Sequence, residues 1–412
     1  MALYEISPDC STGVKLARSV QLVCFALVLA HADYLAVSYF EGTWLVARDG
    51  SGVPADFINV WAAGRLVLAG HAAAAYDWPA HKLVEVSAVG HPFDGYYVWN
   101  YPPTFLFAAA AVSLLPYATA YVVWVFGTFL AYLAAIRAII GDRVGYLLAA
   151  AFPAVLSNFI VGQNGFLTAS LFGGTLTLMG RQPVFAGVLL GLLTCKPHLG
   201  LLFPIALLAS GHWRVCITAG MVAALMAAAS WLAFGSESWL AFFTDIGESS
   251  QAFLAADGAD WSKLQTAFGL TRTLGGSELF AWIVQAALSL VVAAAVAMLW
   301  RSRSAAYEIK AAALGAGAML ATPYLFTYDL VVLAVPLAFL FRLGQTRGFL
   351  AHEMAGIGLA CLLILIFPFV DAPVGFAAVL VVAALIARRA LAITEPVPMA
   401  GRSFDAPRAL GH

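Results

Sequence analysis

Long apolar runs joined by short polar connections dominate the chain, and polar positions gather in two extended segments. A membrane-spanning helix needs about 20 apolar residues. Several runs are shorter, which predicts tilted, broken or re-entrant helices where protein or water surrounds the backbone. The pattern therefore predicts an all-α, polytopic integral membrane protein. The apolar runs lie at about 19–40, 102–116, 118–137, 144–161, 165–180, 183–195, 198–210, 213–234, 278–300, 306–323, 327–341, 350–369 and 373–388.

Composition supports this class. Of the 412 residues, 62% are hydrophobic and only 10% are charged, whereas a soluble domain carries about 25% charged residues. The first run, 19–40, is too long for a signal-peptide core and has no clear small-residue cleavage site, so we interpret it as a retained helix. No Ser/Gly-rich linker or clear internal repeat divides the chain. Residues 1–412 are expected to form a single membrane domain.

Charge and cysteine usage exclude other classes. The net charge of −1 and the lack of a basic run argue against nucleic-acid binding. The five cysteines are scattered, without CxxC spacing. This pattern indicates neither a disulfide framework nor a metal knuckle, and no ligand spacing predicts a metal site.

The polar segments predict the topology. Residues 41–101 hold six acidic against three basic residues, and residues 235–277 hold five against two. The short connections are basic instead, and the positive-inside rule places such loops in the cytoplasm. Both termini, including a tail at 389–412, are then cytoplasmic, and the two polar segments are extracytoplasmic loops. The basic connections contain Arg301 and Arg303, Arg342 and Arg347, and Arg388 and Arg389.

Parity constrains the number of crossings. Thirteen apolar runs cannot leave both ends of the chain on the same side. One run must be a half-helix, or two must form one broken span. The candidates are 102–116 and the pair that meets at Cys195-Lys196-Pro197, because proline removes a helix hydrogen bond. We expect about twelve crossings, with interfacial helices in the loop after the first span.

The first candidate catalytic residue is Asp56, a carboxylate that follows the first span. Asp56 comes after Pro54-Ala55 and before a helical-looking stretch, 57–68. An aspartate at a helix start commonly accepts a backbone N–H as an N-cap. The alternative is a general base that faces the extracytoplasmic side. The two roles do not exclude each other.

Further polar positions lie between apolar runs. Gly70 to Asp77 has the pattern of a helix end and a turn. Tyr101 precedes Pro102-Pro103, which is typical of a first helical turn near a membrane interface. Gln163 and Asn164 lie between two glycines at membrane depth, where amides are costly unless they are paired. A tight turn explains the glycines but does less to explain Gln163.

The most unusual single residue is Lys196, which precedes Pro197-His198. It lies within an otherwise mostly apolar stretch, and no acidic residue is near it in sequence. A lysine at membrane depth suggests a functional site, and a compact ammonium suits a phosphodiester. The alternative is a lysine that snorkels to water. Later in the chain, Asp329 opens an apolar run after Thr327-Tyr328, and there helix capping is the alternative.

Taken in order, these motifs resemble glycosyltransferase family 87, the polyprenyl-phosphate-mannose-type mannosyltransferases with GT-C architecture. The resemblance covers roughly residues 50–340. Each motif is short, but their order in an all-membrane chain is fairly specific. The motifs are Asp56-Phe57 with Trp61, Gly70, Tyr76-Asp77, Tyr101-Pro102-Pro103, Gly162-Gln163-Asn164, Lys196-Pro197 and Thr322-Pro323.

The resemblance implies a GT-C-type helical bundle in the cell membrane with its active site on the extracytoplasmic side. It implies transfer of a hexose, with mannose expected first, from a polyprenyl phosphate to a hydroxyl of a lipid or glycan acceptor, with inversion. Asp56 matches the family's base. Many members carry histidines after the late Ser/Thr-Pro motif. This chain has Tyr324, Tyr328 and Asp329 instead, which leaves the identity of the donor sugar open.

Physical chemistry then assigns expected roles. A polyprenyl phosphate is a good leaving group and needs a cation to stabilise the departing charge, for which Lys196 and Arg65 are the candidates. Asp56 takes the acceptor proton. No nucleotide or other cofactor is implied, and the expected partners are the lipid-linked sugar, the acceptor and membrane lipids. The other residues expected to bind substrate are His198, Gln163, Asn164, Tyr101, Asp77, Tyr328 and Asp329.

A membrane transporter or flippase of a lipid-linked or small polar substrate is the alternative function. Such a protein would also contain broken helices and buried polar residues. It would usually show inverted repeats or paired charges within its spans, and neither is evident in the sequence. A scaffolding or assembly protein would not need Asp56 together with Lys196.

Overall fold

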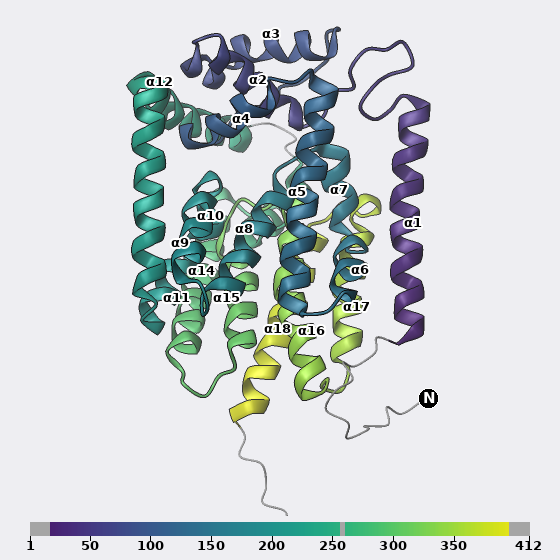
Figure 1. Cartoon of the computed structure of the whole chain (residues 1–412), viewed down its shortest axis with the longest axis vertical. Helices are drawn as coiled ribbons and strands as arrows, with labels where there is room; N and C mark the ends of the chain where they lie inside the picture. The colour runs from purple at the N-terminus through teal and green to yellow at the C-terminus, as the bar shows by residue number, and fades with distance from the viewer. Residues whose placement is uncertain (1–16, 256–259, 395–412) are drawn as a thin grey trace, which may run out of the picture.

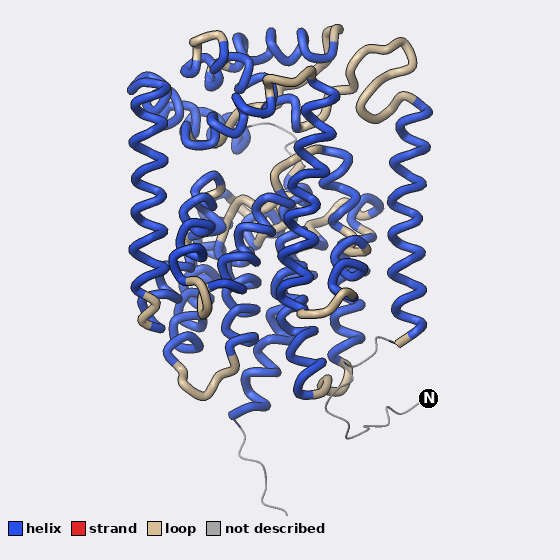
Figure 2. The backbone as a smooth tube through the Cα atoms, in the orientation of Figure 1, coloured by secondary structure: helices blue, strands red, loops and turns tan. Residues whose placement is uncertain are grey.

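Helices form nearly all of the regular structure (Figure 2). The computed structural model describes residues 17–255 and 260–394, and these residues include no β-strand, only an isolated bridge between Val46 and Gly52. The protein is therefore an all-helical membrane protein, as the apolar pattern predicted. The longer helices are α1 (Arg18–Glu41), α5 (Tyr117–Ile140), α12 (Trp213–Ala255), α14 (Glu278–Arg301), α15 (Tyr307–Ala321), α16 (Ala334–Arg347) and α18 (Val374–Thr394).

Six helical segments in the described residues are long and apolar enough to cross a membrane, or seven if one bent pair forms a single span. The remaining apolar runs form shorter helices, so the expected count of about twelve crossings stays a prediction. The shorter helices of the bundle are α6 (Val144–Ala150), α7 (Ala154–Val161), α8 (Gly165–Leu178), α9 (Pro183–Leu192), η3 (Leu193–Cys195), α10 (Pro197–Gly200), α11 (Leu202–Ser210), η4 (Trp261–Lys263), α13 (Ala267–Thr273), η5 (Thr327–Leu333), α17 (Glu353–Leu365) and η6 (Phe367–Phe369).

A layer of short helices lies across one end of the bundle, at the top of Figure 1. This cap layer consists of α2 (Phe57–Leu68), η1 (Ala72–Tyr76), α3 (Trp78–Val89), η2 (Pro103–Phe105) and α4 (Leu106–Val112). Helices α2 and α4 approach closely at Gly64, where an added Cβ would lie 2.0 Å from the Ala109 carbonyl oxygen. Within the run 102–116, helix α4 is only seven residues long, and the run stays a half-helix candidate.

The bundle has a buried centre and exposed edges. In the span formed by η5 and α16, 83% of the most apolar window is buried, compared with 11% in α1. Helix α1 stands at the margin of the molecule (Figure 1). Because apolar side chains outside the bundle can face lipid, a helix such as α1 needs few protein contacts. In η5, by contrast, the residues from Asp329 to Leu333 are buried in the interior.

Several apolar runs are interrupted at proline or glycine. The run 144–161 bends by 61° between α6 and α7, next to Pro153, so it is one of the broken segments that the short runs predict. The break at Lys196-Pro197 occurs where expected, with Lys196 at φ −130° and ψ 72°. Helix α12 does not end at 234, since it kinks at Gly235 (φ 78°, ψ 167°) and continues to Ala255. Part of the predicted loop 235–277 is therefore helical.

The C-terminal end also differs from the prediction. Helix α18 continues through Thr394, so no tail begins at 389. The side chain of Arg389 is buried against Glu353 of α17, with its Nε 2.6 Å from Oε1. Residues 395–412 of the predicted tail lie outside the described residues. A buried arginine needs a charged partner, and Glu353 supplies it.

Both ends of the described chain lie at the end of the bundle opposite the cap layer (Figure 1). The connection after α14, which contains Arg303, lies at that same end. This arrangement agrees with the charge asymmetry, and the side of the membrane that each end faces stays a prediction.

A labelling experiment tests this orientation. In a chain whose five cysteines are replaced, Asp94→Cys places an exposed thiol in the loop after α3, and Ser304→Cys places one after α14. An impermeant maleimide should modify position 94 in intact cells and position 304 only after permeabilisation, because the basic connection is predicted to face the cytoplasm. Modification of position 304 in intact cells would reverse the orientation.

Candidate functional site

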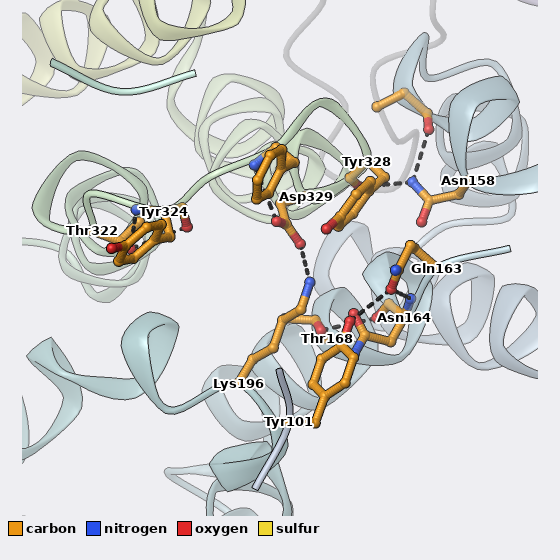
Figure 3. Close-up of polar contacts among 12 residues, drawn as sticks. Tyr101, Asn158, Gln163, Asn164, Thr168, Lys196, Thr322, Tyr324, Tyr328 and Asp329 are labelled. Carbon is orange, nitrogen blue, oxygen red and sulfur yellow. Dashed lines mark hydrogen bonds and ion pairs between the residues drawn. The ribbon is translucent and has the colours of Figure 1, made fainter. Parts of the chain in front are cut away.

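Polar side chains from distant parts of the chain meet beneath the cap layer, where several helices are interrupted. Figure 3 shows Tyr101, Gln163, Asn164, Lys196 and Asp329 turned toward one another. Each of them comes from a helix end or a junction between helices. Irregular backbone at membrane depth is tolerated where it lines a protein-enclosed site, so these interruptions mark a candidate site.

The carboxylate of Asp56 belongs to this region. Asp56 occupies the N-cap position of α2, but its backbone is helical (φ −54°, ψ −28°) and its side chain makes no capping hydrogen bond. The capping interpretation is therefore wrong for the side chain. The carboxylate instead interacts with the Gln163 side chain and with the charges of Lys196 and Lys263.

Burial shifts the protonation equilibrium of Asp56. Desolvation raises the pKa of its carboxyl from 3.8 to about 6, and the Gln163 side chain and the two lysine charges lower it by smaller amounts. Burial disfavours the charged form of an acid, whereas nearby cations favour it. A base whose pKa lies near the working pH is both ionised and able to accept a proton.

A hydrogen bond fixes the amide next to Asp56. The Tyr101 hydroxyl donates to Oε1 of Gln163 at 2.7 Å. Because that oxygen accepts from Tyr101, the NH₂ group of Gln163 is the end that can donate to a carboxylate. The preceding Gly162 (φ +70°) permits this turn, since an added Cβ would lie 2.7 Å from Cβ of Phe57. The glycine is thus required by close packing against α2.

Lys196 forms a buried ion pair. Its ammonium donates to the Asp329 carboxylate, and the two side chains are only 4% and 2% exposed. Nζ also lies 4.8 Å from the ring centroid of Tyr328. The structure therefore supplies the acidic partner that the local sequence lacked, from 133 positions later in the chain. Lys196 does not snorkel to the surface of the protein.

Asp329 also caps its own helix. Its Oδ2 accepts a hydrogen bond from the backbone N–H of Phe326 at 3.2 Å, as the capping interpretation expected. The segment is held further by Asn158 of α7, whose Nδ2 donates to the Tyr328 carbonyl at 2.8 Å. Asp329 is thus positioned by backbone contacts on one side and faces Lys196 on the other.

An apolar cavity adjoins this cluster. Its volume is about 250 Å³, and it lies between α4, α8, α12 and the end of α9. Cys195, which precedes Lys196 in the chain, forms part of the cavity wall. The other large side chains that line it are Phe105, Phe107, Leu167, Leu171, Leu192 and Met226.

The remaining predicted residues divide into two groups. His198 and Asn164 lie beside Lys196 and Tyr101, and Nε2 of His198 has no hydrogen-bond partner among the described residues. Arg65 and Asp77 instead lie on the exposed side of the cap layer. The Arg65 guanidinium is 5.6 Å from the Trp61 ring, and Asp77 accepts from Ala80 N at 3.0 Å as the N-cap of α3.

Two residues at the site were not among the sequence predictions. Lys263 of η4 is exposed, pairs with Asp260 at 3.4 Å and acts on Asp56 from the second polar loop. No local signal links it to a carboxylate 207 positions earlier. Asn158 is fully buried, and it could have been noticed as an amide within the apolar run 144–161.

The arrangement combines a carboxyl group of raised pKa, a buried cation and a nearby apolar cavity. A metal is not evident, since the described residues contain no group of three or more His, Cys, Asp or Glu side chains that could hold one. No curated protein and no solved structure matched the chain.

The model of glycosyltransferase family 87 matches residues 99–323. This region contains Tyr101, Gln163, Asn164 and Lys196, and it ends at the predicted Thr322-Pro323 motif, whereas Asp56 and Asp329 lie outside it. Because the match covers more than half of the 412 residues, the chain belongs to glycosyltransferase family 87.

Proposed function

We propose that this membrane glycosyltransferase transfers a hexose from a polyprenyl-phosphate donor to a hydroxyl of a lipid or glycan acceptor. Mannose is the first sugar to test. The reaction inverts the anomeric carbon and takes place on the extracytoplasmic face of the cell membrane, where the cap layer is predicted to lie. Family membership supports a transferase over the transporter or flippase alternative.

The observation that carries the proposed donor is that Lys196, whose charge acts on Asp56, directly follows Cys195 in the wall of the apolar cavity. The cavity wall includes Cys195, directly beside the lysine. A lipid-linked phosphate needs a cation for its head group and an apolar surface for its chain. These two requirements are met at adjacent positions. A nucleotide-linked sugar would need no apolar cavity.

The proposed step needs one base and one cation. The acceptor oxygen forms a bond to C1 of the sugar while its proton passes to the Asp56 carboxylate. The bond between C1 and the phosphate oxygen breaks, and the phosphate leaves with the electron pair and an added negative charge. Lys196 stabilises this charge in a low-dielectric site. Attack on the face opposite the leaving group inverts the configuration, so no second carboxylate is required.

A transfer assay tests this function. The purified protein is reconstituted in vesicles with decaprenyl phosphate that carries radiolabelled mannose, and membrane glycolipid extract supplies acceptors. We expect release of decaprenyl phosphate together with labelled glycolipid. Asp56→Asn, which retains the shape of the side chain, serves as the matched inactive variant.

Two controls make the result decisive. GDP-mannose replaces the lipid-linked sugar in one parallel reaction, and decaprenyl-phosphate glucose replaces it in another. Transfer from GDP-mannose alone would contradict the lipid-linked donor. Translocation of intact donor across the vesicle membrane without sugar transfer would instead support the flippase alternative. Transfer from the glucose donor alone would retain the mechanism and exclude mannose.

A further inference from the structure

We propose that Asp329 is the resident counter-ion of Lys196 in the donor-free enzyme, and that the donor phosphate displaces it from the ammonium group. The inference rests on the proposed polyprenyl-phosphate donor. It adds a residue that regulates donor affinity without belonging to the reacting atoms. Asp329 would thus be a positioning residue.

Burial explains why the pair exists in the absence of donor. Both side chains are almost completely buried, and an isolated charge in such a place is strongly unfavourable. The mutual attraction of the two charges offsets part of this desolvation cost. Tyr328 adds a ring face beside the ammonium, an arrangement that also favours the cation. The Lys196–Asp329 pair therefore carries no net charge.

The two partners are not held equally. Asp329 has a second hydrogen bond, from the Phe326 N–H, and its segment is tied to α7 through Asn158. Lys196 has a flexible four-carbon stem and three N–H donors, and among the described residues Asp329 is its hydrogen-bond acceptor. Figure 3 shows the lysine side chain extended toward Asp329. The ammonium is the partner with both the freedom and the spare donors to bind another anion.

A donor phosphate would place a second anion against the same ammonium. Asp329 is then left with the Phe326 N–H as its remaining partner and repels the phosphate. Both effects oppose donor binding. Asparagine at position 329 keeps an oxygen that can accept from Phe326 but carries no charge. Asp329→Asn should therefore bind the donor phosphate more tightly, at the expense of stability in the donor-free state, where Lys196 loses its counter-ion.

Binding of farnesyl phosphate to the full-length protein in detergent tests the exchange. Affinity should rise roughly tenfold in Asp329→Asn, within the range typical of coupled binding equilibria. Farnesol, which has the same chain without the charge, should bind both proteins equally. Glu353→Gln is the matched control, because it breaks another buried ion pair, between Arg389 and the first residue of α17. It should lower stability and leave farnesyl phosphate affinity unchanged.

A second variant, Asp329→Glu, keeps the proposal testable if Asp329→Asn does not fold. Asp329→Glu retains the buried negative charge, and its affinity for farnesyl phosphate should stay at or below that of the wild type. A tenfold gain in Asp329→Glu, or unchanged or weaker binding in Asp329→Asn, would overturn the exchange while the donor assignment stands. If the wild type binds farnesyl phosphate no better than farnesol, the proposed donor fails and the exchange fails with it.

Discussion

Replacing Asp56 with asparagine should lower turnover at least ~100-fold while the protein still folds, because general-base catalysis typically contributes that much. Asparagine has nearly the same shape but cannot take the acceptor proton. It leaves no buried negative charge behind, and the side chain does not cap α2, so no helix cap is lost. The measurement is release of polyprenyl phosphate at saturating donor.

Asp94→Asn is the control for this variant. Asp94 is an exposed carboxylate in the same polar segment, and its neutralisation should leave turnover close to that of the wild type. Near-normal turnover in Asp56→Asn would remove the proposed base. A loss of similar size in both variants would instead indicate a general effect of the loop charge.

The dependence of kcat/KM on pH tests the same role of Asp56 independently. Only ionised Asp56 accepts a proton, and burial raises its pKa to about 6. The value of kcat/KM should therefore rise as the pH increases through about 6, and level off above it. In Asp56→Asn, the residual kcat/KM should not show this rise with pH. A wild-type rate that falls across this range would assign Asp56 to an acid role instead.

Replacing Lys196 with methionine should weaken donor binding about tenfold or more, since a hydrogen bond to a charged group contributes roughly 1.5–3 kcal/mol. Methionine keeps an apolar stem of similar length. The structure adds a second effect, because Asp329 would remain as a buried charge without its partner. Breaking such a pair destabilises a protein by about 3 kcal/mol or more. Binding of farnesyl phosphate and unfolding in SDS measure the two effects separately.

The double variant Lys196→Met/Asp329→Asn separates the two losses. It removes both charges, so stability should recover while binding stays weak. Lys196→Arg should retain partial binding because its charge survives with a different geometry. Lys310→Met is the control. Lys310 lies in the first turn of α15 and donates to the Ser302 carbonyl. Wild-type affinity in the double variant would indicate that another cation, such as Arg65 or Lys263, holds the phosphate.

Sequence analysis predicted the fold class and the family because both depend on signals that are local or ordered along the chain. The apolar runs predict helices regardless of what packs against them. The motifs from Tyr101 to Thr322-Pro323 occur in a fixed order, and the family match covers the same region. Lys196 attracted notice because a charge among apolar residues is unusual at any membrane depth.

Other features of the fold were predicted incompletely. The bend at 61° within 144–161 and the continuation of α12 beyond Gly235 depend on what surrounds those segments. A proline or glycine permits a kink, but neighbouring helices decide whether the chain bends, stops or continues. Similarly, Arg389 carried a topology signal in the sequence, yet it is a buried partner of Glu353 in the folded chain.

For the candidate site, the sequence by itself determined which polar residues are unusual, and the tertiary structure decided which of them meet. The sequence was equally consistent with Asp56 as the N-cap of α2. Only the structure shows that Gln163, Lys196 and Lys263 act on its carboxylate. The partner of Lys196 comes from 133 positions later in the chain. Helix propensity, charge and apolar pattern act over a few residues, whereas ion pairs and pKa shifts arise from contacts between distant segments, which only the packing of the helices brings together.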